Sequence, residues 1–237
     1  MSEYNQYRPQ SSFGLPMVVK NLLIINVLLY LATEISTNLD FYQLFGLHFP
    51  TAPNFRVWQP ITYLFMHGDP MHLFFNMFGL YMFGSQLEKY WGPKRFLTYY
   101  MITGIGAAVV HFTIFYFVTM PKFENEVNML VAQGYTVPDG LWDDFLNGNL
   151  VVGASGAIFG LLLAFGMLFP NTELMMLFFP VPIKAKYFVI IYGLIELFSG
   201  VRAAEGDNVA HFAHLGGMLF GFILIKYWNK TMRNRFY

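Results

Sequence analysis

Six apolar segments recur along this 237-residue chain, and they constrain its fold more than any other feature. Each is long enough, or nearly long enough, to cross about 30 Å of hydrocarbon as an α-helix. Hydrophobic residues account for 56% of the sequence and charged residues for only 12%, about half the share that soluble domains carry. We therefore expect an all-α membrane protein in which six transmembrane helices form one bundle. The predicted spans are residues 17–32, 71–87, 96–120, 151–169, 183–199 and 210–228.

Two of the connections between these segments are long. Residues 33–70 are rich in aromatic side chains and are interrupted by Pro50, Pro53 and Pro60, a pattern typical of a loop partly sunk in the membrane interface. Residues 121–150 are polar and acidic. We expect them to form an exposed loop inserted between the third and fourth spans.

Six crossings place both termini on one side of the membrane. Eleven of the 14 basic residues then lie on that side, and basic residues favour the cytoplasmic side. The expected organisation is a short cytoplasmic N-terminal segment (1–16), a six-span domain (17–228) and a basic cytoplasmic tail (229–237). The start of the fourth span then lies toward the outside. Because no organelle-targeting leader is recognisable, the expected location is a bacterial inner membrane.

Charge and residue types exclude several classes of function. The 14 basic and 14 acidic residues balance, so no nucleic-acid partner is expected. The chain has no cysteine, which removes disulfides, thiolate metal ligands and a cysteine nucleophile. Neither His67 and His72 nor His211 and His214 has an adjacent glutamate, so a metal-dependent protease is disfavoured. We expect no cofactor and no metal.

Four polar residues inside the predicted spans mark a candidate site. His72 and Asn76 are four residues apart in the second span and share one helix face. Ser155 opens the fourth span, and His214 lies in the sixth. Polar residues in a membrane bundle are costly and usually face inward, where they are functional. These four residues are therefore the first candidates for chemistry.

Small residues accompany this serine and this histidine. Four glycines stand in the spacing that lets helices approach closely in a bilayer: Gly156, Gly160, Gly217 and Gly221. We expect the fourth and sixth spans to touch along these glycine faces. Ser155 and His214 would then meet near the outer ends of their helices.

The surroundings of Ser155 favour a nucleophile. Gly153 and Gly156 leave its hydroxyl accessible, and the free N–H groups of a helix's first turn stabilise a developing anion. A histidine on the neighbouring helix supplies a base. Each feature also has a plainer reading, because a membrane serine often bonds its own helix and a His–Asn pair is often structural. The convergence of these features favours the chemical reading.

Three motifs resemble those of the rhomboid intramembrane serine proteases. They are GASG at 153–156, HLFFN at 72–76 and AHLGGMLFG at 213–221. The resemblance runs from about residue 17 to 228 and implies a six-span rhomboid-like bundle. It implies a serine–histidine dyad without a third acidic member, in which Ser155 is the nucleophile and His214 the general base. It also implies that His72, Asn76 and the Ser155 backbone N–H form the oxyanion hole.

Two positions near these motifs differ from the pattern common in the family, and two further polar residues lie close to His214 in the sequence. Phe159 stands where many rhomboids have a tyrosine stacked on the catalytic histidine, and it can stack without hydrogen bonding. Gln59, after Trp58, stands where the family commonly has arginine, which puts the rigidity of the first loop in doubt. Asp207 is not cast as a third catalytic member. His211 is expected to be an entrance or packing residue.

The expected function is an intramembrane serine endopeptidase that cuts single-span membrane protein substrates near the outer face, with the lipid bilayer as its other partner. A catalytically silent rhomboid-like protein that holds client helices is the alternative. A transporter is a further alternative, because Glu196 in the fifth span suits a proton or ion site. For Glu196 we favour a carboxyl group bonded to neighbouring helices.

Overall fold

The computed structural model describes residues 14–175, 181–202 and 208–233, and these residues are mostly helical. Each predicted span overlaps a helix. These helices are α1 (Met17–Ile35), α4 (Pro70–Gly79) continued by η2 (Leu80–Gly84) and α5 (Ser85–Trp91), α6 (Pro93–Ile114) continued by η3 (Phe115–Thr119) and α7 (Met120–Ala132), α9 (Ser155–Leu168), α10 (Ala185–Arg202) and α11 (Asn208–Arg233). Among the described residues, two helices, 17–35 and 93–132, are long and apolar enough to cross a membrane. The six-span count therefore stays a prediction.

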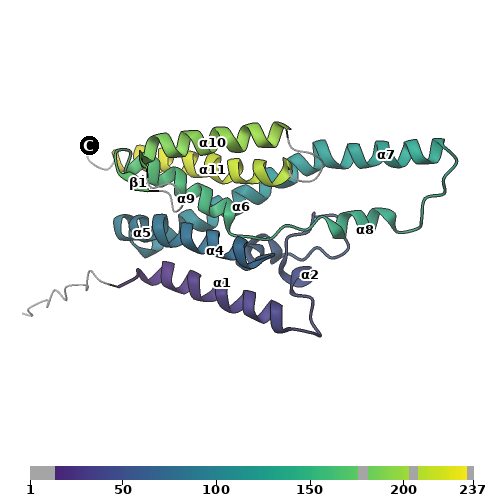
Figure 1. Cartoon of the computed structure of the whole chain (residues 1–237), viewed down its shortest axis with the longest axis horizontal. Coiled ribbons are helices and arrows are strands. Elements are labelled where there is room, and N and C mark those ends of the chain that lie inside the picture. The colour runs from purple at the N-terminus through teal and green to yellow at the C-terminus, as the bar shows by residue number, and fades with distance from the viewer. Residues whose placement is uncertain (1–13, 176–180, 203–207, 234–237) are drawn as a thin grey trace, which may run out of the picture.

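Helices α6, α9 and α11 form the centre of the bundle, and α10 packs on α9 and α11 (Figure 1). Helices α1 and α4 lie on the opposite side of α9 from α10 (Figure 1). The first turn of α1 and the last turn of α11 lie at the same end of the molecule. This arrangement agrees with an even number of crossings.

Glycines permit the close packing of the central helices. A Cβ at Gly217 of α11 would overlap the carbonyl oxygen of Gly156 in α9, so α9 and α11 touch there as predicted. The other two glycines of the predicted faces behave differently. A Cβ at Gly160 would lie 2.6 Å from Thr103 Cβ, and one at Gly221 would overlap the Tyr99 hydroxyl. Both of these partners belong to α6, which packs against the two helices.

The prediction of a loop at 121–150 is wrong for most of its length. Residues 120–132 form α7, and Leu141–Gly148 form α8. The two helices project from the bundle as a hairpin (Figure 1), in which the rings of Phe123 and Phe145 stack 3.8 Å apart. Helix 93–132 continues past Pro121 because the π-helical η3 before it accommodates the missing N–H and the proline ring.

The connection 33–70 contains short helical turns rather than one long helix. They are α2 (Phe41–Phe45), α3 (Gln59–Thr62) and the 3₁₀ turn η1 (Tyr63–Phe65). The connection is joined to the start of the fourth segment by an antiparallel bridge between Leu47 and Val151. It is thereby held against the residues that precede α9.

The doubt about Gln59 and the rigidity of this connection is not supported. Gln59 is fully buried, and its Oε1 accepts hydrogen bonds from the backbone N–H groups of His48 at 3.3 Å and Arg56 at 3.1 Å. Its Nε2 donates to the carbonyl oxygens of Gln43 at 3.2 Å and Asn54 at 3.0 Å. A neutral amide thus holds four backbone groups, because it offers both donors and acceptors.

The fifth segment begins differently from the prediction. Residues 183 and 184 belong to a two-stranded antiparallel sheet of β1 (Glu173–Met175) and β2 (Pro182–Lys184), and α10 begins only at Ala185. The ladder pairs Glu173 with Lys184 and Leu174 with Ile183. Besides the single bridge between Leu47 and Val151, this is the only strand pairing within the described ranges, and it departs from an all-α fold.

A buried glutamate caps the first helix. Helix α1 has no side-chain cap of its own, and both oxygens of Glu88 in α5 accept N–H groups of its first turn, Val18 at 3.0 Å and Val19 at 2.8 Å. Glu88 is 4% exposed. A carboxylate at a helix N-terminus satisfies free N–H groups and matches the helix dipole.

Candidate active site

The backbone before α9 presents Ser155 at the first position of the helix. The N–H of Gly153 donates to the carbonyl oxygen of Tyr63 at 2.9 Å, and Gly153 has φ +121°, which favours glycine. A Cβ at this position would lie 2.6 Å from His72 Nε2 and 3.8 Å from Ser155 Oγ. The bare Cα of Gly153 therefore lets these two side chains converge.

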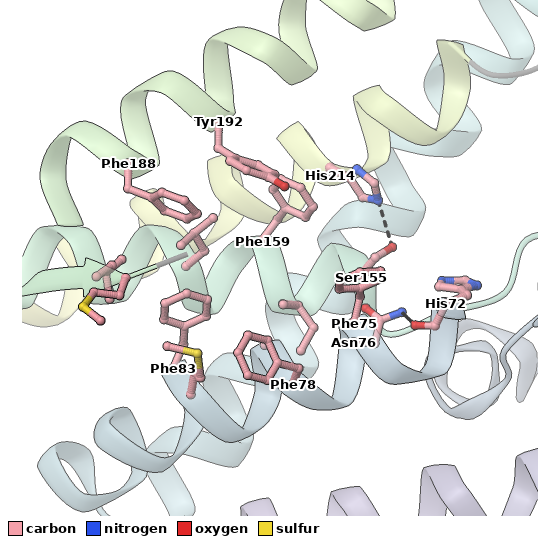
Figure 2. A pocket seen from close by; sticks show the side chains of 16 residues that line it. His72, Phe75, Asn76, Phe78, Phe83, Ser155, Phe159, Phe188, Tyr192 and His214 are labelled. Atoms are coloured by element: carbon pink, nitrogen blue, oxygen red, sulfur yellow. Dashed lines mark hydrogen bonds between the residues drawn. The ribbon is translucent and has the colours of Figure 1, made fainter. Parts of the chain in front are cut away.

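Ser155 and His214 are brought into direct contact. His214 Nε2 lies 2.9 Å from Ser155 Oγ (Figure 2), a hydrogen bond between α9 and α11. Gly156, the residue after Ser155, contacts Gly217, which lies one turn beyond His214. This contact allows the two helices to approach this closely. The meeting of the two side chains, expected from the glycine spacing, is present.

An aromatic ring supports the histidine. The ring of Phe159 stacks on His214 with centroids 4.2 Å apart and planes 7° from parallel. Phe159 in turn contacts Tyr192 of α10, with centroids 5.9 Å apart. The sequence analysis allowed Phe159 to stack on His214, and the ring does so, which restricts the rotation of the His214 ring.

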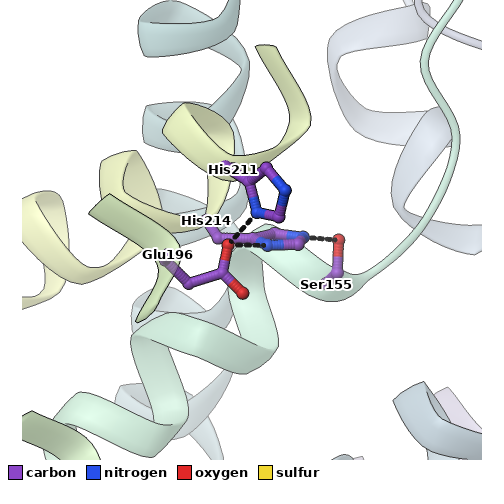
Figure 3. Close-up of polar contacts among 4 residues, drawn as sticks. All are labelled: Ser155, Glu196, His211 and His214. Carbon is purple, nitrogen blue, oxygen red and sulfur yellow. Dashed lines mark hydrogen bonds and ion pairs between the residues drawn. The ribbon is translucent and has the colours of Figure 1, made fainter. Parts of the chain in front are cut away.

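A carboxylate lies on the far side of the histidine ring. Glu196 Oε2 lies 3.0 Å from His214 Nδ1 and 2.7 Å from His211 Nδ1 (Figure 3). Glu196 is on α10, so the favoured reading of a carboxyl bonded to a neighbouring helix is confirmed. His211, expected at the entrance or in packing, is also a partner of this carboxylate. Asp207 lies outside the described residues.

The sequence held a signal for this contact that the predictions did not use. Glu196 is an acidic residue within an apolar segment, and the next helix carries two histidines. Such a charge needs a partner in a bundle. The predictions gave it neighbouring helices in general and did not pair it with His214.

His72 and Asn76 lie on α4 beside Ser155 (Figure 2). Asn76 Nδ2 donates to the carbonyl oxygen of His72 at 3.1 Å, which uses one of its two N–H groups. His67, just before α4, is fully buried, and its ring meets that of His72 edge-on with centroids 5.1 Å apart. Burial lowers the pKa of His67 to about 4, so His67 is neutral at pH 7.

A cavity of about 500 Å³ opens from these polar groups into an apolar slot. At one end lie His72, Asn76, Ser155 and His214. The rest is lined by residues of the helix 70–91 and of α10, which face each other across it (Figure 2), and by residues of α9 and β1. Its aromatic members are Phe75, Phe78, Phe83, Phe159, Phe188 and Tyr192. An extended apolar segment of another chain suits such a slot.

One cluster has the donor atoms of a metal site. One ligand atom each from Glu196, His211 and His214 lies within 4.8 Å of the others. Both histidine Nδ1 atoms are hydrogen bonded to the same carboxylate oxygen, so the cluster is satisfied without an ion. The expectation that the chain uses no metal stays a prediction.

Residues 54–230 match the model of the rhomboid domain family. RHOMBOID-like protein 12, mitochondrial, from Arabidopsis thaliana is 27% identical over 92% of this chain and 60% of that protein. Rhomboid-like protease 3 from Toxoplasma gondii is 27% identical over 78% of this chain and 57% of that protein. The chain thus spans less than two thirds of the length of these relatives.

A third relative bears on location. Rhomboid protein 1, mitochondrial, from Saccharomyces cerevisiae is 28% identical over 72% of this chain and 42% of that protein. Two of these relatives are named as mitochondrial proteins, so the comparisons do not support the expectation of a bacterial inner membrane. The orientation of the termini stays a prediction.

The family match covers well over half of the chain. It includes all three motifs read from the sequence, at 72–76, 153–156 and 213–221. These relatives and this match agree with one another. The chain is an integral membrane protein that belongs to the rhomboid family.

Proposed function

We propose that this chain is an intramembrane serine endopeptidase that hydrolyses peptide bonds of transmembrane substrates with Ser155 as nucleophile and His214 as general base. The observation that carries the proposal is the 2.9 Å contact between His214 Nε2 and Ser155 Oγ at the polar end of an apolar cavity. Family membership supports the class of reaction. One relative, from Toxoplasma gondii, is named a rhomboid-like protease.

The contact supports a two-step hydrolysis. His214 Nε2 takes the proton of Ser155 Oγ as Oγ bonds to the substrate carbonyl carbon, and the carbonyl electron pair moves to the oxygen. When the tetrahedral intermediate collapses, the C–N bond breaks and Nε2 gives its proton to the leaving amine. Water then repeats the sequence on the ester, and His214 again moves the proton. No cofactor is needed for this sequence.

The oxyanion needs donors on the side of Ser155 away from His214. The N–H of Ser155 stands in the first turn of α9, where helix N–H groups lack intrahelical partners. His72 and the second N–H of Asn76 lie at the same end of the cavity. We propose these three groups as the oxyanion hole, each contributing about 3 kcal/mol in the transition state.

The shape and lining of the site suit a membrane-spanning substrate. The apolar slot between α4 and α10 accepts an extended apolar segment, while the polar end admits the water that hydrolysis consumes. A regular helix hides its peptide bonds, so the substrate must unwind where it is cut, which glycine or proline promotes. We propose single-span membrane proteins as substrates, cut near the outer face.

Two measurements on the purified protein in proteoliposomes test this function. A fluorophosphonate probe reports a reactive serine, and a single-span reporter with a glycine-containing upper half reports cleavage. We expect Ser155→Ala to abolish labelling and to lower cleavage at least 1,000-fold. Ser85→Ala, which changes a serine of α5 that does not line the cavity, is the matched control and retains both.

The same experiment separates the two candidate functions. Equal cleavage by the wild type and Ser155→Ala refutes the assignment of the nucleophile. A wild-type protein that binds the reporter but neither labels nor cleaves is instead the catalytically silent client-binding protein. The hydrogen-bonded Ser155 and His214 favour the enzyme, because a binding protein has no need of that pair.

A further inference from the structure

A buried carboxylate lies against the proposed base. Glu196 Oε2 accepts hydrogen bonds from Nδ1 of His214 and Nδ1 of His211 (Figure 3), and the Glu196 side chain is 9% exposed. An ionised carboxylate only accepts hydrogen bonds, so both Nδ1 atoms carry the hydrogen. Paired with two donors, the buried charge is stabilised in place.

This contact decides the tautomer of His214. A neutral imidazole has one ring hydrogen, and here Nδ1 holds it for Glu196. The lone pair of Nε2 is therefore directed at Ser155 Oγ, 2.9 Å away. The other tautomer would present an N–H to Ser155 and would be unable to take its proton.

We propose that Glu196 is a positioning residue for His214, so that this chain uses a Ser155–His214–Glu196 arrangement rather than a dyad alone. The inference rests on the proposed function. Glu196 stays ionised throughout and exchanges no proton: the proton moves from Ser155 Oγ to His214 Nε2 and then to the leaving amine. The carboxylate holds the ring in the productive tautomer and stabilises the imidazolium that forms in each step.

Within the described ranges, further titratable groups lie around His214, including Tyr192 of α10, whose ring contacts Phe159. His72 of α4 lies across the cavity, and His211 precedes His214 by one turn and shares its carboxylate partner. On α6, the Tyr99 hydroxyl donates to the Gly160 carbonyl, and the His111 ring stacks against Phe115. Of these groups and Glu196, the glutamate alone brings a negative charge to His214.

The test uses Glu196→Gln, which keeps the size of the side chain and removes its charge. We expect kcat to fall about 100-fold or more, with KM within about threefold of wild type, because the base is impaired and substrate binding is not. Without the charge the imidazolium is less stable, so the acid limb of the kcat/KM profile moves to lower pH. Glu196→Asp keeps the charge and is expected to recover part of kcat and the wild-type acid limb.

The chain offers a matched control in its other buried glutamate. Glu88 is 4% exposed and holds the N–H groups of Val18 and Val19, far along the sequence from the cavity residues of α9 to α11. Glu88→Gln is expected to lower the thermal midpoint while kcat and the acid limb stay at wild-type values. If the loss of any buried charge lowered activity, Glu88→Gln and Glu196→Gln would change kcat and the acid limb alike.

A second measurement needs no substitution of Glu196. In wild-type protein with ¹⁵N-labelled histidine, the nitrogen shifts distinguish a protonated from an unprotonated ring nitrogen, and His214→Ala identifies the His214 signals. We expect Nδ1 protonated and Nε2 unprotonated at the pH of maximal activity. This reading holds even where Glu196→Gln fails to fold.

The outcomes are separable. Wild-type kcat and acid limb in Glu196→Gln, or a His214 protonated at Nε2 alone, overturns the role of Glu196 and leaves the proposed protease intact. Absence of fluorophosphonate labelling at Ser155 in the wild type overturns the proposed function itself.

Discussion

Two buried side chains, Gln59 and Glu196, each gather several hydrogen-bond partners, yet they serve different ends. Gln59 binds backbone N–H and carbonyl groups of the connection 33–70, whose positions it fixes. Glu196 binds the side chains of His211 and His214. A neutral amide can donate and accept, whereas a carboxylate only accepts and brings a charge.

The difference teaches what each network can do. Backbone groups do not titrate, so the Gln59 network contributes shape and stability over the whole physiological pH range. Imidazoles do titrate, so the Glu196 network acts on proton positions. Substitutions in the first network are therefore expected to change stability, and substitutions in the second to change rate.

The largest expected effect on stability is that of Gln59→Ala. It leaves the His48 and Arg56 N–H groups and two carbonyl oxygens without their partner in a buried region, which costs about 3–4 kcal/mol. We expect a clearly lower thermal midpoint in detergent, with kcat at low temperature within about threefold of wild type. Gln133→Ala, at an exposed glutamine after α7, is the control and leaves the midpoint unchanged. A large loss of kcat in Gln59→Ala without a change in its thermal midpoint would show that the Gln59 network, like the Glu196 network, acts on rate rather than on stability.

The Gln59 network also shows where sequence reasoning failed. Glutamine in place of the arginine common in the family suggested a less rigid loop, because glutamine lacks the several N–H donors of a guanidinium group. That argument left out the backbone groups that a glutamine amide can bind. The acidic composition of 121–150 suggested a loop, although Phe123 and Phe145 supply the apolar contact that pairs α7 with α8. Phe123 and Phe145 meet only because the chain reverses between α7 and α8. The partners of Gln59 are backbone groups between Gln43 and Arg56, whose direction the residue types do not reveal.

The candidate site was more predictable because its signals are local. Motif spacing placed His72 and Asn76 on one helix face, and the glycines beside Ser155 and His214 implied that their helices touch. Glu196 was not paired with His214, because the relative shift of α10 along α11 depends on packing that the sequence does not display. The types and spacing of residues can be read from one sequence. The register between two packed helices depends on the folded bundle and cannot be read in this way.

A smaller effect is expected at His67, which contacts the connection 33–70 on one side and His72 on the other. Its backbone carbonyl accepts the Tyr42 hydroxyl at 2.9 Å, and its ring touches that of His72. The folded state lowers the pKa of His67 from 6.5 to about 4, so the unfolded state binds more protons between these values. Stability is therefore full above about pH 6.5 and falls as the pH drops toward 4, by up to about 3 kcal/mol.

The measurement for His67 is the thermal midpoint between pH 7 and pH 4 in wild type and in His67→Phe, which keeps a buried ring but cannot titrate. We expect the wild-type midpoint to fall more steeply over this interval. Parallel curves for the two proteins would show that His67 contributes nothing to the acid sensitivity.

The smallest effect is expected from substitution of Phe159, which supports His214 of the Glu196 network through packing alone. Its ring stacks on His214 at 4.2 Å, and such contacts are worth about 1 kcal/mol beyond burial. Phe159→Leu keeps the side chain apolar and removes the aromatic face, so we expect kcat to fall about fivefold while the acid limb of the pH profile stays in place. That second readout separates Phe159 from Glu196, since a neutral ring restrains the imidazole without stabilising its charge. An acid limb displaced as far in Phe159→Leu as in Glu196→Gln would mean that ring orientation, rather than the carboxylate charge, governs the protonation of His214.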